Sequence, residues 1–386
     1  MAGCTPAAPP EHRGARMRQR VRTIAQWAVV LGGLGVLGWQ LPVLVSEAGR
    51  LGAELAHLRW GWVGAAVLLG VGSLAAYGEL HRWLLIAGGV RLPVRTVQAI
   101  NFAENALSTT LPAVGNAAGF VYAAYQLRKR NVDVALAAWS VVLSGAVATV
   151  VLMLLGIAGT GGVGQIQPLV AGALAGGVVL TAWACWAVVN RPSALRRCLL
   201  AVTWLGRRLP GRCRTCRRAW MTDPDATVRR LSDRIGLLRP SGPQWVAVAA
   251  LAALSWILDY LSLCLSVVSL GHPVPWSTLV LGFLAVQGAI ALQIFPGGAG
   301  LAEGGLLGVL ITSGLPAAPA MATVLVYRAI NWLGLAALGW VVYAVQIHLA
   351  PRHKHMHAPE APTVPASPRR TARSRSNGPA NYRITN

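Results

Sequence analysis

Long apolar runs separated by short polar segments extend from residue 24 to residue 348. A helix needs about 20 predominantly apolar residues to cross the hydrocarbon core of a bilayer. The pattern therefore predicts an all-α polytopic membrane protein with about six transmembrane helices. The six predicted spans are residues 24–46, 61–80, 133–158, 168–189, 244–270 and 319–347.

Two further apolar stretches, 97–127 and 277–314, are interrupted near the middle by Pro112 and Pro296. Each half is shorter than the roughly 20 residues of a comfortable crossing. We therefore predict two re-entrant helical hairpins, whose irregular backbone has to be buried in protein or to line a cavity. The alternative is that proline and glycine only kink two ordinary spans.

The charges are few and clustered. Only 12% of the residues are charged, against about 25% in a soluble domain, which excludes an ordinary soluble enzyme. The net charge of +22 comes from basic clusters that flank apolar runs, as the positive-inside rule expects of cytoplasmic segments. We predict a multi-pass protein of the cytoplasmic membrane with both termini inside. Its parts are a basic tail (1–23), a membrane domain (24–348) with a basic loop (191–243), and a disordered basic tail (349–386).

The basic loop predicts contact with anionic lipids of the cytoplasmic leaflet. Nucleic acid is not expected as a partner, because no aromatic-interleaved basic patch accompanies the charge. No metal or cofactor is expected either, since Cys213-Arg-Thr-Cys216 lacks a second ligand pair. A homo-oligomer stays open. The excess of Arg over Lys, with abundant Ala and Gly, indicates a GC-rich bacterial genome.

The two interrupted stretches also suggest an internal repeat. Shifting the chain so that Pro112 falls on Pro296 also places Val142 on Val326, and a hairpin is followed by a span in each copy. The charge pattern makes one hairpin open inside and the other outside. We therefore predict an inverted repeat, the construction that many secondary transporters use for alternating access.

Ionisable residues inside apolar runs cost about 2.5–3.5 kcal/mol each at a helix centre, so each is a functional candidate. Glu303 follows the second break at the start of a helix, where the positive end of the helix dipole stabilises an anion. Arg328 lies in the next span and can pair with a carboxylate or a phosphate. Two interpretations stay open. Either a Glu303–Arg328 ion pair locks the hairpin, or Arg328 meets a lipid phosphate while Glu303 positions it or takes a proton.

Three other acidic residues carry less information. Glu79 lies at the rim beside Arg82 and reads as an interfacial residue, whereas Asp259 is a candidate third member of the charged cluster. For Asp259 the alternatives are capping of Ser262 or local packing. Glu104 precedes the first break, where it would face the cavity.

Two further patterns concern uncharged residues. Neutral hydrogen bonds can come from Tyr327, Asn105, Asn116, Gln287 and Asn331. The stripe Gly300-x3-Gly304-x3-Gly308 predicts close helix packing.

Three motifs resemble a known family. Pro296-Gly297-Gly298-Ala299-Gly300-Leu301-Ala302-Glu303, Tyr327-Arg328 and Trp256-Ile257-Leu258-Asp259 are similar to signatures of the lysylphosphatidylglycerol synthase transmembrane family, also described as flippase-like. The resemblance implies that the membrane part moves modified phospholipids between leaflets. It also implies that Glu303, Arg328 and Asp259 line the lipid path. Our candidate substrate-binding residues are Glu303, Arg328, Asp259, Gly297, Gly298, Gly300, Pro296, Tyr327, Glu104 and Pro112.

The chain departs from the family pattern in two ways. In the first repeat, Asn116 stands where the family usually has Glu, and Gly119 where an Arg is expected. No stretch is long enough for the soluble aminoacyl-transferase domain, so we expect a transporter rather than an enzyme. The leading prediction is a translocase for a phospholipid or lipid-linked molecule. The alternatives are a scaffold or accessory subunit of a cell-envelope lipid pathway and a headgroup transferase.

Overall fold

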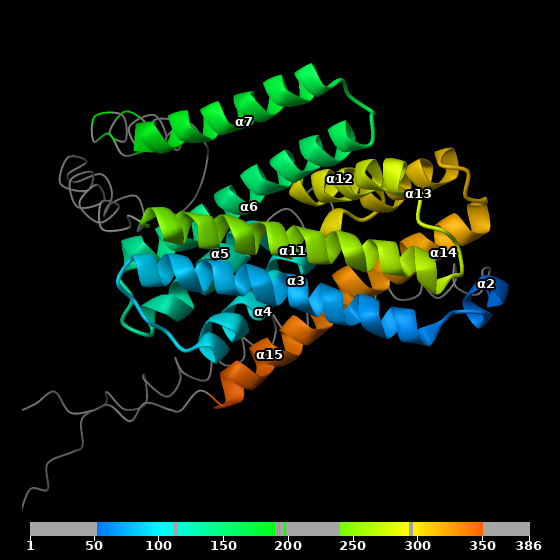
Figure 1. The fold of residues 1–386 in the computed structure, drawn as a ribbon. Coiled ribbons are helices and arrows are strands. Elements are labelled where there is room, and N and C mark those ends of the chain that lie inside the picture. The colour runs from blue at the N-terminus through cyan, green and yellow to red at the C-terminus, as the bar shows by residue number, and fades with distance from the viewer. Residues whose placement is uncertain are drawn as a thin grey trace, which may run out of the picture. The chain divides into compact units, whose positions relative to one another are not determined.

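The computed structural model describes residues 52–111, 115–189, 240–292 and 296–349, with a few isolated positions between 191 and 197. These residues form helices and no strand, as the sequence predicts. The helices, labelled in Figure 1, are α2 (Gly52–Ala56), α3 (Trp60–Ala87), α4 (Val94–Thr110), α5 (Gly115–Arg128), α6 (Val134–Gly162), α7 (Pro168–Val189), α11 (Gly242–Ser269), α12 (Trp276–Leu292), η1 (Pro296–Gly298), α13 (Leu301–Thr312), α14 (Ala317–Arg328), η2 (Ala329–Gly334) and α15 (Leu335–Leu349).

Five helical segments within this part of the chain are long and apolar enough to cross a membrane. They coincide with five of the six predicted spans, and the last of them runs through α14, η2 and α15. The predicted span 24–46 lies outside the described residues, as do both predicted tails and most of the loop 191–243. Those boundaries stay predictions.

Each interrupted stretch forms two short helices that pack side by side. In the first, Gly119 of α5 lies against Glu104 of α4, and Gly115 lies against Ser108. Since the later glycine meets the earlier α4 residue, α4 and α5 run antiparallel. In the second, Gly282 of α12 faces Leu306, and Ala285 faces Gly305, so α12 and α13 are antiparallel too. A single kinked span therefore describes neither stretch.

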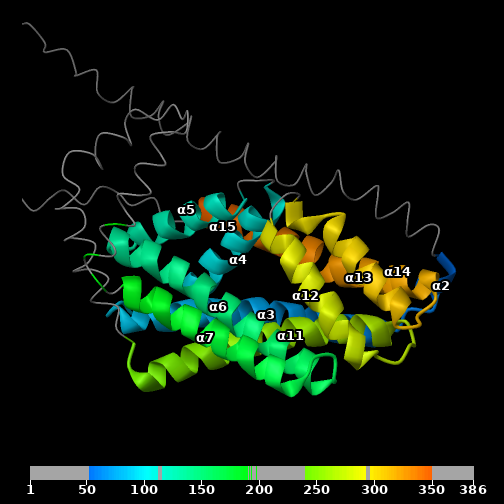
Figure 2. The ribbon, with the colours of Figure 1, turned by 90° about the horizontal axis from the view of Figure 1, so that it is seen from above.

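The order α3–α4–α5–α6 repeats as α11–α12–α13–α14, with 28 residues in both α3 and α11 and 17 in both α4 and α12. Helices α3 and α11 pack against each other (Figures 1 and 2). Counted from the start of each helix, Ser73 and Ser255 hold the same position, and their hydroxyl oxygens are 3.4 Å apart. Further along, the Ser262 hydroxyl donates to the Ala66 carbonyl, so the two helices are antiparallel. The pseudo-twofold axis therefore passes between Ser73 and Ser255.

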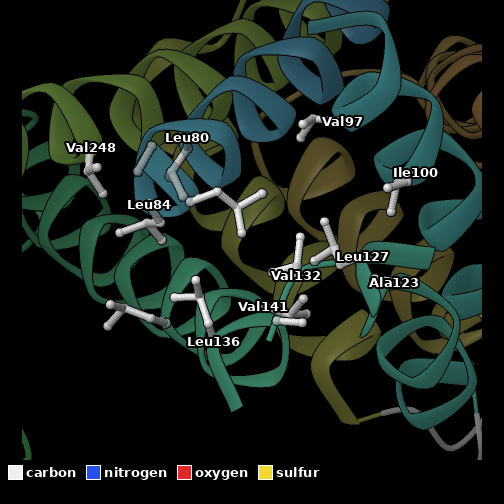
Figure 3. Close-up of a cluster of buried hydrophobic side chains, with 14 residues drawn as sticks. Leu80, Leu84, Val97, Ile100, Ala123, Leu127, Val132, Leu136, Val141 and Val248 are labelled. Carbon is white, nitrogen blue, oxygen red and sulfur yellow. The ribbon is translucent and has the colours of Figure 1, made fainter. Parts of the chain in front are cut away.

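The largest apolar cluster lies where α3, α4, α5, α6 and α11 meet (Figure 3). Leu80 and Leu84 of α3 and Val248 of α11 are fully buried there. In contrast, α7 packs against α6 (Figure 1) and leaves large side chains such as Leu169 and Trp183 exposed. An all-round apolar helix of this kind is suited to face lipid.

Candidate functional site

A buried ion pair closes the second hairpin onto the last span. The Arg328 side chain is 4% exposed, and its Nε donates to Glu303 Oε1 at 2.6 Å. Its terminal nitrogen donates to the Gly297 carbonyl in the break between α12 and α13. Because burying a guanidinium requires such partners, Arg328 fixes the geometry of the break. The ion-pair interpretation of the sequence is therefore present in the structure.

Glu303 has a double role at the start of α13. It is the third residue of that helix, and its Oε2 accepts a hydrogen bond from the Gly300 backbone N–H at 2.6 Å. A carboxylate in the first turn satisfies a free N–H and interacts with the positive end of the helix dipole. Unlike Arg328, the Glu303 side chain is 28% exposed. The acidic side of the pair is thus the more accessible one.

The glycines of the break allow the backbone to approach an aromatic ring. Gly297 has φ +57° and Gly298 has φ +73°, both in the left-handed region that favours glycine. A Cβ on Gly297 would overlap the Trp332 indole, and one on Gly298 would lie 2.9 Å from the backbone nitrogen of Ile290. Together with Pro296, which starts the turn, they form the break itself.

Trp332 belongs to the site, although the sequence analysis missed it. The Arg328 guanidinium lies 4.6 Å from the centroid of the indole, a cation–π distance. The indole N–H points to the carbonyl of Thr109 at 3.4 Å, near the end of α4. Trp332 therefore connects the breaks of both hairpins. Its spacing of four residues from Arg328 was an available signal, because residues four apart share a helix face.

A π-helical segment, η2 (Ala329–Gly334), begins directly after Arg328. Its wider turn changes the direction in which the following side chains project, and such segments are frequent at functional sites. Within it, Asn331 donates to the Ser262 hydroxyl of α11 at 2.8 Å, while Trp332 lies under the second break. The π-helical segment thus directs the Asn331 side chain to α11 and the Trp332 side chain to the second break.

Asp259 joins three helices beside the ion pair. Its Oδ1 accepts from the Tyr327 hydroxyl at 3.0 Å, and its Oδ2 accepts from the Gln287 amide at 2.9 Å. No hydrogen bond links Asp259 to Arg328 among the described residues, and its hydrogen-bonded contact with the cluster is Tyr327. The capping alternative is wrong, because the Ser262 hydroxyl donates to the Ala66 carbonyl instead.

The first half carries neutral side chains at the corresponding positions. Counted from the helix starts, Tyr77 corresponds to Asp259, Ser144 to Tyr327, and Gly145 to Arg328. The Tyr77 and Ser144 hydroxyls are 3.3 Å apart, so a neutral pair replaces the Asp259–Tyr327 pair. Glu104 lies half-buried on α4 against Gly119. Pro112 lies outside the described residues.

The predicted glycine stripe Gly300-x3-Gly304-x3-Gly308 does not pack in the described part of the chain. Nothing there lies within 4 Å of a Cβ placed on any of the three glycines. The packed face of α13 carries Ala302, Leu306 and Leu310, which are all buried. That face lies two residues, more than half a turn, away from the stripe. Small-x3-small spacing thus did not identify the face of α13 that meets partners within the described residues.

Glu79 and Arg82 form a second ion pair, one turn apart on α3. The two side chains are 24% and 22% exposed and are hydrogen-bonded to each other. The pair holds no helix break, and it lies outside the second-half cluster.

Comparison with known families agrees with the motifs. The family described as the lysylphosphatidylglycerol synthase TM region matches residues 24–339, which contain both halves of the repeat. No curated protein matches the chain.

Proposed function

The chain belongs to the lysylphosphatidylglycerol synthase TM family, and we propose that it moves a phospholipid or lipid-linked molecule between the leaflets of a membrane. The family supports a multi-pass membrane protein of a lipid-related pathway. Translocation rests on one observation above all: a buried guanidinium at a helix break is paired with a carboxylate that is still 28% exposed.

The proposed step is an exchange of partners at Arg328. A phosphate offers the guanidinium the same two-pronged hydrogen bonding as a carboxylate does. As the phosphate arrives, Glu303 leaves Arg328 and keeps its hydrogen bond to Gly300, which holds the acid near the break. When Glu303 returns, it displaces the phosphate. Binding and release then use one pair of charges, which avoids leaving either charge buried and alone.

Neighbouring residues keep Arg328 in place during this exchange. The Gly297 carbonyl and the Trp332 ring contact the guanidinium independently of Glu303. Tyr327, which precedes Arg328 in α14, is held by the hydrogen bond from its hydroxyl to the Asp259 carboxylate. Exposed leucines flank the break at the end of α12 and the start of α13, Leu292 and Leu301, and acyl chains can pass along them. The headgroup would stay at the charged cluster while the chains remain in lipid.

The membrane setting is part of the proposal. The two antiparallel helix pairs would enter as re-entrant hairpins from opposite faces, with both termini on the cytoplasmic side of a bacterial cytoplasmic membrane. The basic loop 191–243 would hold anionic headgroups at about 1 kcal/mol per basic residue near the surface. This loop would raise the local concentration of anionic substrate near the entrance.

The test follows fluorescent phosphatidylglycerol and phosphatidylcholine in proteoliposomes, with a membrane-impermeant quencher. Glu303→Gln keeps the shape but removes the charge, and we expect flux to fall by about tenfold or more, the equivalent of one charge-assisted hydrogen bond. Glu79→Gln is the matched control, an acid that is also paired with arginine but lies away from the break. Flux should stay near wild type in this control. Quenching no greater than in empty liposomes would contradict translocation, and equal flux in all three proteins would contradict the exchange of partners at Arg328.

The neutral first half favours a second candidate, a scaffold or accessory subunit of a cell-envelope lipid pathway. A body whose first half lacks the charged network is suited to hold partners without moving lipid itself. In that case Glu303→Gln leaves the cellular phenotype intact as long as the protein folds. A translocase loses the phenotype while the amount of folded protein stays unchanged.

A further inference from the structure

Glu104 of α4 differs from the other acidic residues within α3, α11 and α13, because its carboxylate has no ion pair or side-chain hydrogen bond in the described part of the chain. Glu79 pairs with Arg82, Glu303 pairs with Arg328, and the Asp259 carboxylate accepts two hydrogen bonds. In contrast, no ion pair or side-chain hydrogen bond in the described part of the chain reaches the Glu104 carboxylate. Its corresponding position in α12 is the apolar Val286. Glu104 therefore has no acidic counterpart at the matched position of the second half.

The neighbours of Glu104 are hydroxyl groups and glycines. Tyr77 of α3 and Tyr122 of α5 are close enough for electrostatic interaction with the carboxylate. Gly119 of α5 lies directly against the Glu104 side chain, since a Cβ on this glycine would be 3.2 Å from Glu104 Cγ. From α15, the Tyr343 ring lies tilted against the Tyr122 ring, with centroids 5.1 Å apart.

Arg130, at the end of the first hairpin, interacts electrostatically with Tyr122 and donates a hydrogen bond to the Gln126 carbonyl. From the second break, η1 contributes no titratable group. The surroundings of Glu104 thus provide hydroxyls but no paired cation among the described residues. A carboxylate there is far better accommodated in its neutral, protonated form, because an unpaired charge in an apolar body is costly.

We propose that Glu104 takes up a proton from one side of the membrane and releases it to the other, and that this exchange couples lipid movement to a proton gradient. The inference rests on the proposed function. The step converts the carboxylate to a carboxylic acid with a proton from water and reverses it on the opposite side. A proton suits the site better than a hard metal cation, which takes six or more oxygen ligands.

The contacts of α4 connect Glu104 to the charged cluster of the second half. Ser108 donates to the Glu104 carbonyl, and Thr109 donates to the Asn105 carbonyl, at 2.8 and 2.7 Å. The Thr109 carbonyl in turn faces the indole N–H of Trp332, which stacks on Arg328. A movement of α4 that follows protonation of Glu104 would therefore be transmitted to Arg328 through the Trp332 side chain.

The first arm of the experiment needs no lipid movement. Infrared spectra of the purified full chain are recorded across a pH titration for wild type, Glu104→Gln and Glu79→Gln. We expect a titrating carboxylic acid C=O band in wild type and in Glu79→Gln, and its loss in Glu104→Gln. Gel filtration and thermal unfolding check that the variants are folded. An unchanged titrating band in folded Glu104→Gln would overturn the proton site.

The second arm applies a gradient of one pH unit to proteoliposomes that contain fluorescent phosphatidylglycerol. Coupling to one proton shifts the steady-state ratio between leaflets by up to about tenfold in wild type and in Glu79→Gln. Glu104→Gln should leave the ratio near one under the gradient, whatever its rate of lipid movement without a gradient. A gradient response in Glu104→Gln would overturn the coupling. If no protein moves lipid, translocation itself fails, and the infrared arm alone decides whether Glu104 exchanges a proton.

Discussion

The two halves of the molecule share a framework and differ in charge. Helices α3 and α11 have the same length, α4 and α12 have the same length, and an antiparallel helix pair follows in both. Yet Gly145 stands in place of Arg328, and Tyr77 in place of Asp259. In the described part of the first hairpin, α4 and α5 pack through Gly115 and Gly119, with no counterpart of the Glu303–Arg328 pair. The two halves thus share helix lengths and order but carry different charges, with the Glu303–Arg328 pair in the second half and Glu104 in the first.

The largest difference is expected from removing the guanidinium. Arg328→Ala leaves Glu303 without its partner and the Gly297 carbonyl unsatisfied, which should lower the free energy of unfolding by about 3–5 kcal/mol. Gly145→Ala at the matched position places a Cβ 4.0 Å from the Tyr77 hydroxyl, an ordinary contact, and should gain up to about 1 kcal/mol. Denaturation in mixed micelles measures both. Similar losses in the two variants would remove the contrast between the halves.

A smaller loss is expected from adding a methyl group at the second break. Gly297→Ala combines a positive φ with overlap of the Trp332 indole, and the strain should cost about 1–3 kcal/mol. Gly304→Ala, on the exposed side of α13, has open space and should be neutral or stabilising. Thermal unfolding in detergent compares the two. If Gly297→Ala is as stable as Gly304→Ala, the close approach of break and indole is wrong.

The hydroxyl pairs of the two halves, Tyr327–Asp259 and Tyr77–Ser144, should differ in the same direction. Tyr327→Phe removes a hydrogen bond to a carboxylate, for an expected loss of about 1.5–3 kcal/mol, whereas Tyr77→Phe removes a bond between neutral hydroxyls worth about 0.5–1.5 kcal/mol. Unfolding midpoints under identical conditions rank the variants. The reverse ranking would show that the charged network adds no strength to the second half.

The smallest effect is expected at the paired acid of α3. Glu79→Gln breaks an ion pair whose side chains are about one quarter exposed, and such pairs contribute about 0–1 kcal/mol. The same denaturation measurement at low and high salt should give nearly the same stability. A loss comparable to that of Arg328→Ala would indicate that the position of an ion pair in this body matters little.

Much of this architecture can be predicted from the sequence, because the length of each apolar run is read directly along the chain. Five described spans and both interruptions appear where apolar runs and Pro-Gly motifs place them. The Glu303–Arg328 pair could also be predicted, because an unpaired charge in apolar surroundings is costly and two opposite charges lower this cost by pairing. These features depend on residue type and spacing alone.

Other features depend on which faces meet in three dimensions. Trp332 reads as one more apolar residue until the π-helical segment brings it under the second break. The stripe from Gly300 to Gly308 had the right spacing for packing, but within the described residues the opposite face of α13 carries the contacts. Correspondence between Tyr77 and Asp259 was hidden because their chemistry differs, and only the matched helix lengths reveal it.

The contact between Ser73 and Ser255 has a consequence for biosynthesis. The two residues are separated by 182 positions, so at a translation rate of 5–20 residues per second α11 emerges roughly 10–40 s after α3. During that interval, α4 can already bond α3, because Gln98 and Asn101 donate to the carbonyls of Ala75 and Leu74. The nascent first half would therefore wait in the membrane with one face of α3 uncovered, and a ribosome that stalls before α11 would leave that face open to chaperones or proteases.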